Sequence, residues 1–453
     1  MTPGRVAELT VHRPENRTGE RTPEARRPMT VPDATVVVAV HNAMPHLTAC
    51  LDSLAGQSLA PGRLEVMAVD DGSTDGGEAL LDEYAARHPG LFRVVHQPDS
   101  GGPAAPANRG QAMARGRYVL FLGTDGDPGR PGHLGHLGPE ALERLVAAAD
   151  AWGSDVVVPK RVGADGRPVP QGIFHANAES VGFTDSALAW ALSDTKLFRL
   201  DFIRRHGLRR NEELKAFSDQ PFTLEACLRA GRVSVLADYD CCFPAPRDGR
   251  GDGRGDGLGD VTERAGALDR LLGVAALQQV AVELADPGEE LDAIRTRSFA
   301  REVPRLLEGG FLLLDDALQE RVCVEVRRLI ERFGARAVYS RLPAAVRVRL
   351  ELAAAVRPDA LRDQIRYESA HGTPPVVVDG RRHYAGFPAF RNTRLGLPDE
   401  LFLLREEPVV EAAPPLNLAQ QLWRGIVPEQ VRRGLRRRPL WRRLANSVNG
   451  GRG

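Results

Sequence analysis

The sequence predicts an α/β protein with a mostly parallel sheet, followed by a helical region and a small β-rich C-terminal module. Residues 34–40 form an unbroken run dominated by β-branched side chains, which is typical of a strand buried on both faces. Such runs alternate with segments of helical periodicity as far as residue 245, and this alternation indicates βαβ units. Beyond residue 261 the periodicity is mostly helical, until turn residues and a Val-rich run appear after residue 357.

The first half of the chain contains the elements of the predicted sheet. We expect strands at residues 34–40, 64–69, 92–95, 118–122, 156–158 and 233–243. We expect helices at residues 47–59, 76–87, 141–151, 188–206 and 222–230. Right-handed crossovers bring the C-terminal ends of parallel strands to one edge of the sheet, and we therefore expect the functional loops there.

Shifts in composition suggest where these regions begin and end. The predicted regions are a disordered leader at 1–33, an α/β domain at 34–245, a Gly/Arg/Asp-rich flexible loop at 246–260, a helical region at 261–356, a β-rich module at 357–410 and a basic tail at 411–453. The step Asp379-Gly380 directly follows a Val run, which indicates a hairpin turn in the β-rich module.

Overall composition excludes several functional classes. The 453 residues carry 60 Lys and Arg against 60 Asp and Glu, so there is no basic surplus of the kind that nucleic-acid binding needs, and we expect no nucleic-acid partner. The 5 cysteines show no metal-ligand spacing. No apolar run approaches the roughly 20 residues that span a bilayer, and no apolar signal core stands at the N-terminus. We therefore expect a soluble cytoplasmic protein.

Two carboxylates directly follow the second predicted strand. Asp70 and Asp71 precede Gly72, which permits a sharp turn, and Ser73 or Thr74 can cap the next helix. Carboxylates at such a strand end can accept hydrogen bonds from ribose hydroxyls or a base N–H. Helix capping alone would explain the same residues, so this loop by itself leaves both interpretations open.

A second acidic loop follows the strand at 118–122. Asp125 and Asp127 are separated by one residue, and paired carboxylates can converge on a hard cation that favours oxygen ligands. The alternative is a polar, Gly-rich turn. The sequence has neither a G-x-G-x-x-G fingerprint nor a Gly-Lys-Ser/Thr phosphate loop, which argues against a dehydrogenase and a P-loop NTPase.

Four segments in this order resemble the signatures of family-2 glycosyltransferases. They are Thr35-Val-Val-Val-Ala-Val-His-Asn42, Val69-Asp-Asp-Gly-Ser-Thr-Asp75, Gly101-Gly-Pro-Ala-Ala-Pro-Ala-Asn-Arg-Gly110 and Gly116-Arg-Tyr-Val-Leu-Phe-Leu122. The resemblance covers about residues 34–245 and implies a GT-A fold, a UDP-sugar donor, inversion at the anomeric carbon, and Mn²⁺ or Mg²⁺ as cofactor. It also implies a nucleotide-sugar site, formed by Val40, Asn42, Asp70, Asp71, Gly102, Asn108, Arg109 and Thr124.

Two further segments extend the resemblance toward the acceptor. The stretch beginning at Lys196 is similar to a family segment beside the acceptor, and Asp219 stands where the family places its general base. An inverting transfer needs one carboxylate to take the proton of the attacking hydroxyl. Asp219 could also cap the helix that begins near Pro221, and the two roles are compatible. The family's adjacent Glu is replaced here by Ser218.

The metal motif departs from the family pattern. Where the family commonly has Phe-Leu-Asp-x-Asp-Asp, this chain has Gly123 in place of the first Asp, and only Asp125 stays in register, with Asp127 as a shifted second ligand. The alternative is a non-catalytic glycan-binding or scaffold protein with a degenerate metal site. A nucleotidyltransferase on a similar sheet is a third hypothesis, which would release pyrophosphate instead of a nucleoside diphosphate.

The C-terminal half is more loosely similar to bacterial transferases that glycosylate wall teichoic acid. That similarity implies a polyol-phosphate polymer or other envelope glycan as acceptor, and association between copies of the chain through this half. The Arg-rich tail contains Trp423 and Trp441, and such a pattern is compatible with contact at the inner face of the cell membrane. A solvated basic helix is the alternative.

Overall fold

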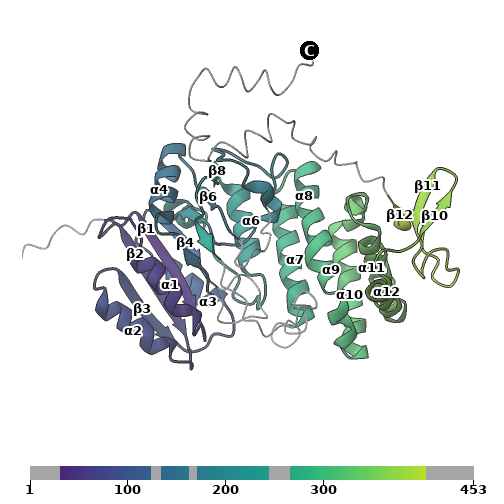
Figure 1. The fold of residues 1–453 in the computed structure, drawn as a ribbon, viewed down its shortest axis with the longest axis horizontal. Coiled ribbons are helices and arrows are strands. Elements are labelled where there is room, and N and C mark those ends of the chain that lie inside the picture. The colour runs from purple at the N-terminus through teal and green to yellow at the C-terminus, as the bar shows by residue number, and fades with distance from the viewer. Residues whose placement is uncertain (1–30, 124–133, 163–170, 244–265, 405–453) are drawn as a thin grey trace, which may run out of the picture. The chain divides into compact units, whose positions relative to one another are not determined.

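The computed structural model describes residues 31–123, 134–162, 171–243 and 266–404 (Figure 1). These belong to two compact units, Met1–Gly372 and Thr373–Gly453. Most of the predicted leader, the loop at 246–260 and the tail at 411–453 lie outside the described residues. Among the residues described, no helix combines the length and the apolar character that crossing a membrane requires.

The larger unit is built on a seven-stranded sheet with strand order β3-β2-β1-β4-β7-β6-β8. Its strands are β1 (Ala34–Val40), β2 (Leu64–Asp71), β3 (Phe92–Gln97), β4 (Tyr118–Leu122), β6 (Val156–Pro159), β7 (Leu197–Arg199) and β8 (Val233–Leu236). Only β7 runs antiparallel to its neighbours β4 and β6, and the other pairs are parallel. The predicted mostly parallel sheet is confirmed.

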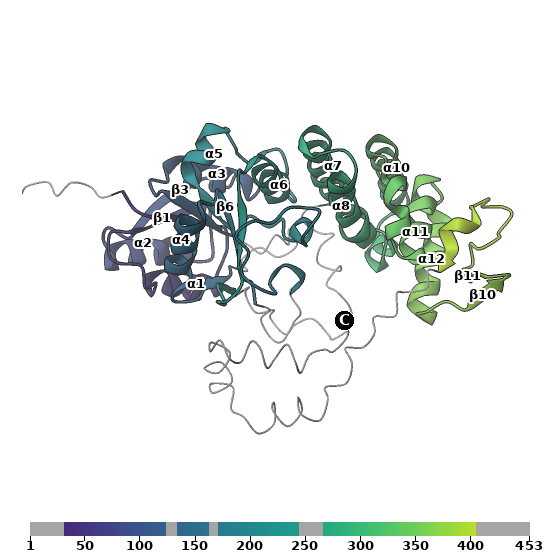
Figure 2. The ribbon, with the colours of Figure 1, turned by 90° about the horizontal axis from the view of Figure 1, so that it is seen from above.

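Both faces of the sheet are covered by helices, as the unbroken apolar strands require. Val36 and Val38 point to one face of β1 and Val37 to the other, because successive side chains of a strand alternate. The helices on the first face are α1 (His46–Ala55), α2 (Gly77–Arg87) and α4 (Ala141–Trp152). Those on the second face are α3 (Ala104–Met113), α5 (Leu200–Arg205), α6 (Asp219–Arg229) and α7 (Ala267–Leu284) (Figure 2).

One glycine sets how closely α3 approaches the sheet. A Cβ added at Gly110 would lie 2.4 Å from Cγ1 of Val37, so any larger residue would push α3 away from β1. Asn108 and Arg109 are predicted site residues on α3. The close packing of α3 against β1 therefore sets how far these two residues lie from the sheet.

Two predicted elements were wrong in detail. Residues 188–206 are mainly not helical: they contain a short 3₁₀ turn, η3 (Leu188–Trp190), then strand β7 and helix α5. Leu197 and Phe198 are fully buried between β4 and β6, so pairing in the sheet overrides the local helical spacing. The strand predicted at 233–243 ends at Leu236, and β9 (Cys242–Phe243) pairs instead with β5 (His136–Leu137).

The helical region begins with α7 and continues to His371. Its other elements are α8 (Glu289–Arg297), η4 (Ser298–Glu302), α9 (Val303–Arg305), η5 (Gly309–Leu313), α10 (Asp316–Phe333), η6 (Ala335–Arg341), α11 (Ala344–Ala354) and α12 (Pro358–His371). The expected change to β structure at 357 was therefore placed too early. Pro358 occupies the first turn of α12, where its missing N–H does no harm, so the proline begins a helix here instead of ending one.

The second unit contains a small antiparallel sheet of β10 (Val376–Asp379), β11 (Arg382–Ala385) and β12 (Leu403–Leu404). The hairpin predicted at Asp379-Gly380 is confirmed, because Asp379 pairs with Arg382 and Gly380 adopts a φ of 59°. Phe402, which precedes β12 directly, is fully buried and lies 5.2 Å from the Phe390 ring centroid.

Candidate active site

The candidate site begins where β1 and β2 end. In the parallel register Val40 lies beside Asp70, so both reach the same edge of the sheet. Asp70 and Asp71 are each 2% exposed. The Val40 side chain packs in the core, which leaves only its backbone to face a ligand.

The carboxylate of Asp71 is hydrogen-bonded to β3 and to the loop that follows β3. Its carboxylate accepts hydrogen bonds from Nε2 of Gln97 at 2.6 Å and from Oγ of Ser100 at 2.8 Å. Its neighbour Asp70 accepts from the backbone N–H of Ser73 at 3.1 Å. That bond closes a turn within the loop and does not cap a helix. The cap predicted for Ser73 or Thr74 is wrong, because α2 begins at Gly77 with no side-chain cap at Gly76. Asp71 reaches sideways to β3 and the loop that follows it.

Asn42 joins the first two loops. Its φ of 48° is unusual for a residue other than glycine. Its Oδ1 accepts from the backbone N–H of Thr74 at 2.8 Å, and its own backbone N–H donates to Oγ of Ser73 at 3.1 Å. A strained backbone held by two hydrogen bonds gives this loop a defined shape, as a ligand-binding loop requires.

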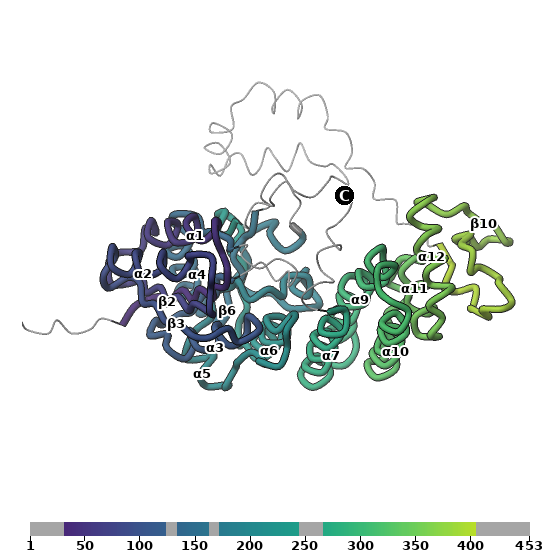
Figure 3. Tube along the Cα trace, turned by 90° about the horizontal axis from the view of Figure 1, so that it is seen from below, coloured from purple at the N-terminus to yellow at the C-terminus, as the bar shows by residue number. Residues whose placement is uncertain are grey.

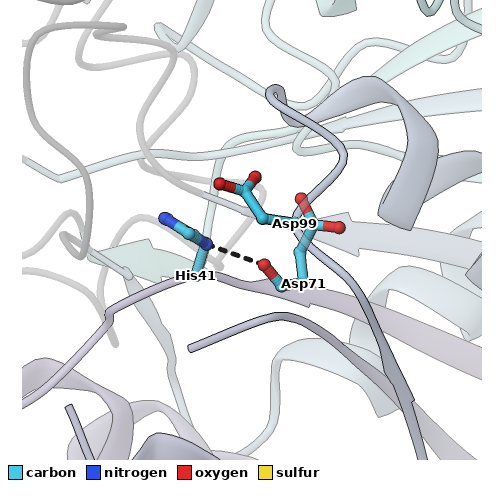
Figure 4. A group of neighbouring side chains, drawn as sticks. All are labelled: His41, Asp71 and Asp99. Carbon is cyan, nitrogen blue, oxygen red and sulfur yellow. Dashed lines mark hydrogen bonds between the residues drawn. The ribbon is translucent and has the colours of Figure 1, made fainter. Parts of the chain in front are cut away.

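A possible metal-binding group lies in the same place. His41, Asp71 and Asp99 each offer one ligand atom, and these atoms all lie within 4.8 Å of one another (Figure 4). Nδ1 of His41 is hydrogen-bonded at 2.8 Å to the backbone oxygen of Asp71, and the Asp71 carboxylate already accepts from Gln97 and Ser100. Both Asp71 oxygens therefore already have protein partners, whereas Asp99 accepts through Oδ1 from the backbone N–H of Gly101.

The segment after β3 connects the loops at the ends of β1 and β2 to the far side of the candidate site. Asn108 is buried, and its Nδ2 donates to the backbone oxygen of Arg210 at 2.9 Å and to Glu212 at 2.8 Å. A Cβ at Gly102 would lie 3.9 Å from Cα of Lys215. Arg109 is exposed and donates to Oε1 of Gln97 at 3.0 Å. The predicted donor segment therefore contacts the chain that leads to Asp219.

Asp219 is the first residue of α6. Burial raises its pKa to about 7, and the nearby charge of Asp194 acts in the same direction, while Arg210 and Arg297 oppose both. Its own backbone N–H also favours the charged form. A carboxylate whose pKa lies near neutral pH can take up a proton during a reaction and release it afterwards. Asp219 thus combines a helix-start position with the acid–base behaviour that a general base needs.

Arg210 is held between two aromatic rings beside this carboxylate. Its guanidinium carbon lies 3.9 Å from the Phe121 ring centroid and 4.3 Å from that of Phe222. Its Nε donates to Asp194 at 3.1 Å, and the side chain is only 2% exposed. Stacking and the ion pair leave Arg210 one orientation, and Phe121 belongs to β4, the strand that precedes the predicted metal motif.

Lys196 is buried beneath the same network. It is 1% exposed, and its Nζ donates to the backbone oxygen of Ser193. Burial lowers its pKa to about 8, while the negative charges of Asp194 and Asp219 act in the opposite direction. In this conformation Lys196 lies among the acidic residues and does not face solvent, so its predicted position beside the acceptor stays a prediction.

A continuous series of contacts joins the predicted residues. It runs from Asp71 through Ser100 to the Gly102 segment, and from Asn108 through Arg210 to the surroundings of Asp219. Three predicted residues, Thr124, Asp125 and Asp127, lie outside the described residues.

Sequence reasoning missed three charged residues near Asp219. They are Asp194, Arg210 and Arg297, which come from two separate loops and from α8. No local pattern marks them, because each acts through a partner far away in the chain. The only signal available was the pair of adjacent arginines, Arg209 and Arg210, ahead of an acidic stretch.

The sheet order, its one antiparallel strand and the acidic loops at its edge define a glycosyltransferase of the GT-A class. Residues 35–189 match the model described as glycosyl transferase family 2, and residues 273–365 match the one described as glycosyl transferase TarS linker domain. These matches place residues 35–189 in glycosyltransferase family 2 and relate residues 273–365 to the TarS linker.

Known relatives support the same grouping. The poly(ribitol-phosphate) beta-glucosyltransferase of Bacillus spizizenii is 33% identical over 215 residues, 48% of this chain and 32% of that relative. The poly(ribitol-phosphate) beta-N-acetylglucosaminyltransferase TarS of Staphylococcus aureus is 34% identical over 217 residues, 48% of this chain and 36% of that relative. The aligned region thus spans about a third of these relatives.

A solved structure matches over a longer stretch. The crystal structure of the S. aureus TarS fragment 1–349 in complex with UDP-GlcNAc gives a TM-score of 0.63 at 25% identity. The match covers 82% of this chain and 99% of that fragment. The likeness therefore extends beyond the GT-A sheet into the helical region.

Proposed function

We propose that the protein transfers a hexose or N-acetylhexosamine from a UDP-sugar to a hydroxyl of a polyol-phosphate polymer, with inversion at the anomeric carbon. The observation that carries the proposal is Asp219, a carboxylate with a raised pKa at the start of α6, joined by contacts to the loops around Asp71. The donor class and the polymer are suggested by relatives named for poly(ribitol-phosphate) glycosylation and by a relative's structure with UDP-GlcNAc.

The proposed reaction is a single displacement. The acceptor oxygen forms a bond to the anomeric carbon while the bond from that carbon to the diphosphate breaks, and UDP leaves. Asp219 takes the proton from the attacking hydroxyl as the new bond forms, so the bridging oxygen does not have to carry a charge. Asp70, Asp71 and Asn42 hold the nucleoside, and they do so with polar groups already fixed by the loop hydrogen bonds.

A divalent cation is part of the proposal. We expect Asp125 and Asp127 to hold Mn²⁺ or Mg²⁺, which when bound would neutralise charge on the diphosphate. This expectation is separate from the group of His41, Asp71 and Asp99, in which both Asp71 oxygens already accept hydrogen bonds from Gln97 and Ser100.

A run of arginines that begins at Arg297, whose charge acts on Asp219, supports an anionic acceptor. Arg297, Arg301 and Arg305 follow one another at intervals of four residues from the end of α8 into α9. Burial lowers the pKa of Arg301, and the positive charges of Arg305, Arg297 and Arg161 lower it further, while the negative charge of Glu302 opposes them. Mutually repelling guanidinium groups are stabilised when an anion lies among them, and their planar donors match phosphate oxygens.

The test is UDP release from UDP-GlcNAc or UDP-glucose with poly(ribitol-phosphate) as acceptor. We expect Asp219→Asn to reduce transfer by about 10²- to 10⁴-fold while UDP-sugar binding persists, because only the proton acceptor is removed. The matched control is Asp201→Asn, which removes an exposed carboxylate from α5. The enzyme assignment fails if the wild-type protein binds UDP-sugars and glycans without turnover, which is the outcome expected of a scaffold.

A further inference from the structure

Helix α7 of the helical region packs directly against the segment that leads into the predicted base. It lies beside α6 in the views of Figures 1, 2 and 3. A Cβ added at Gly273 of α7 would lie 2.7 Å from the backbone oxygen of Ala216 and 3.0 Å from Cβ of Phe217. Only a glycine therefore allows α7 this close to residues 216 and 217.

The segment that α7 touches is conformationally restrained. Phe217 has a φ of 57°, in the left-handed region that residues other than glycine rarely adopt. Such a backbone persists only where the surroundings determine it. The Arg270 guanidinium of α7 lies 5.7 Å from the Phe217 ring centroid, so α7 contacts both the backbone and the ring of this residue. Asp219 follows two residues later.

Helix α8 makes a second contact on the other side of Asp219. Nη1 of Arg297 donates to Oε1 of Gln220 at 2.9 Å, and Nη2 of Arg297 lies 3.0 Å from Oε1 of Glu302. All three side chains are buried, with Arg297 only 4% exposed. Gln220 directly follows Asp219, and the positive charge of Arg297 also favours the charged form of that carboxylate.

We propose that the helical region positions the general base, with Gly273 setting the backbone of residues 216–217 and Arg297 holding Gln220 and supplying a fixed positive charge near Asp219. This inference rests on the proposed function for its catalytic meaning. Gly273 and Arg297 are positioning residues, because they act on substrate only through Asp219. The helical region is then part of the active site's construction and more than a spacer.

Several charged groups surround this arrangement. Those facing Asp219 are Asp194 and Lys196 ahead of β7, Arg210 ahead of α6, and Arg297 on α8. Those facing Arg297 are Asp219 on α6, Arg301 and Glu302 on η4, and Arg305 on α9. Arg210, Arg297 and Lys196 are thus the positively charged side chains near Asp219 that oppose the effect of Asp194.

The first experiment introduces one methyl group. We expect Gly273→Ala to lower kcat roughly ten- to hundredfold with the donor KM unchanged, because the base is displaced while the nucleotide loops are untouched. Hydrogen exchange of the amides at 216–224 should accelerate in this variant. The matched control is Gly309→Ala, which adds the same methyl in the helical region where no atom lies within 4 Å.

The second experiment removes one charge. Arg297→Gln can still donate a hydrogen bond to Gln220 but lacks the positive charge, so the acidic limb of the kcat/KM–pH profile should move to higher pH by about 1. Arg297→Lys keeps the charge and should leave that limb in place, whatever it does to kcat. Arg295→Gln is the control, since Arg295 lies on the same helix and pairs with Asp292.

The outcomes separate the two proposals. Unchanged exchange at 216–224 in Gly273→Ala, or an acidic limb that Arg297→Gln leaves in place, overturns the positioning role. If the folded wild-type protein transfers no sugar from any UDP-sugar, the proposed function fails, and the exchange measurement still decides whether α7 restrains the segment before Asp219.

Discussion

The pH dependence of transfer is the sharpest consequence of the environment of Asp219. Burial and the charge of Asp194 raise the pKa of this carboxyl to about 7, and a general base must be deprotonated to act. For a pKa of about 7, the deprotonated fraction is about 9% at pH 6 and about 91% at pH 8. We therefore expect kcat/KM to rise about tenfold between these pH values.

One substitution tests the cause of that profile. Asp194→Asn removes the negative charge that raises the pKa of Asp219, so the acidic limb should move to lower pH. If the pKa falls by 1, the ratio of activities at pH 8 and pH 6 drops from about 10 to about 2. Asp201→Asn, an exposed carboxylate on α5, should leave the ratio unchanged.

The assay is UDP release under kcat/KM conditions across pH 5.5 to 8.5, in buffers of constant ionic strength. An aspartate with an ordinary pKa would give a flat profile above about pH 5. A flat wild-type profile, or an Asp194→Asn profile that moves to higher pH, would refute the idea that burial and Asp194 together tune Asp219.

Three further outcomes are expected. Arg210→Ala should lower the free energy of unfolding, measured by urea denaturation, by about 3 kcal/mol, because it leaves Asp194 without its buried partner. The control is Arg209→Ala, which removes one side of an exposed ion pair and should change the same free energy by less than about 1 kcal/mol. Gly110→Ala should destabilise by about 1–3 kcal/mol in the same measurement, since its Cβ would meet Val37 at 2.4 Å, and an unchanged midpoint would contradict this packing. Chelation with EDTA should abolish transfer, and excess Mn²⁺ should restore it. Full activity in EDTA would show that the proposed divalent cation is not needed for transfer.

The order of elements in the first half of the chain could be predicted from local pattern. The run at 34–40 is apolar on both faces, which only a strand covered on both sides explains, and it forms β1, an interior strand of the sheet. The hairpin at Asp379-Gly380 was predictable in the same way, since turn geometry depends on adjacent residues. Strand β7 was not, because its three residues pair with partners that lie about 40 to 80 residues away.

The same distinction between local pattern and long-range packing applies to the candidate site. Local sequence was enough to predict which residue types stand at strand ends and at the start of α6, because glycines, prolines and carboxylates act over a few neighbouring residues. The folded chain was needed to show that Asp219 has Asp194, Arg210 and Arg297 as neighbours, and that Gly273 meets Phe217. Burial and charge act through space, and the distances that set them arise only when remote segments pack together.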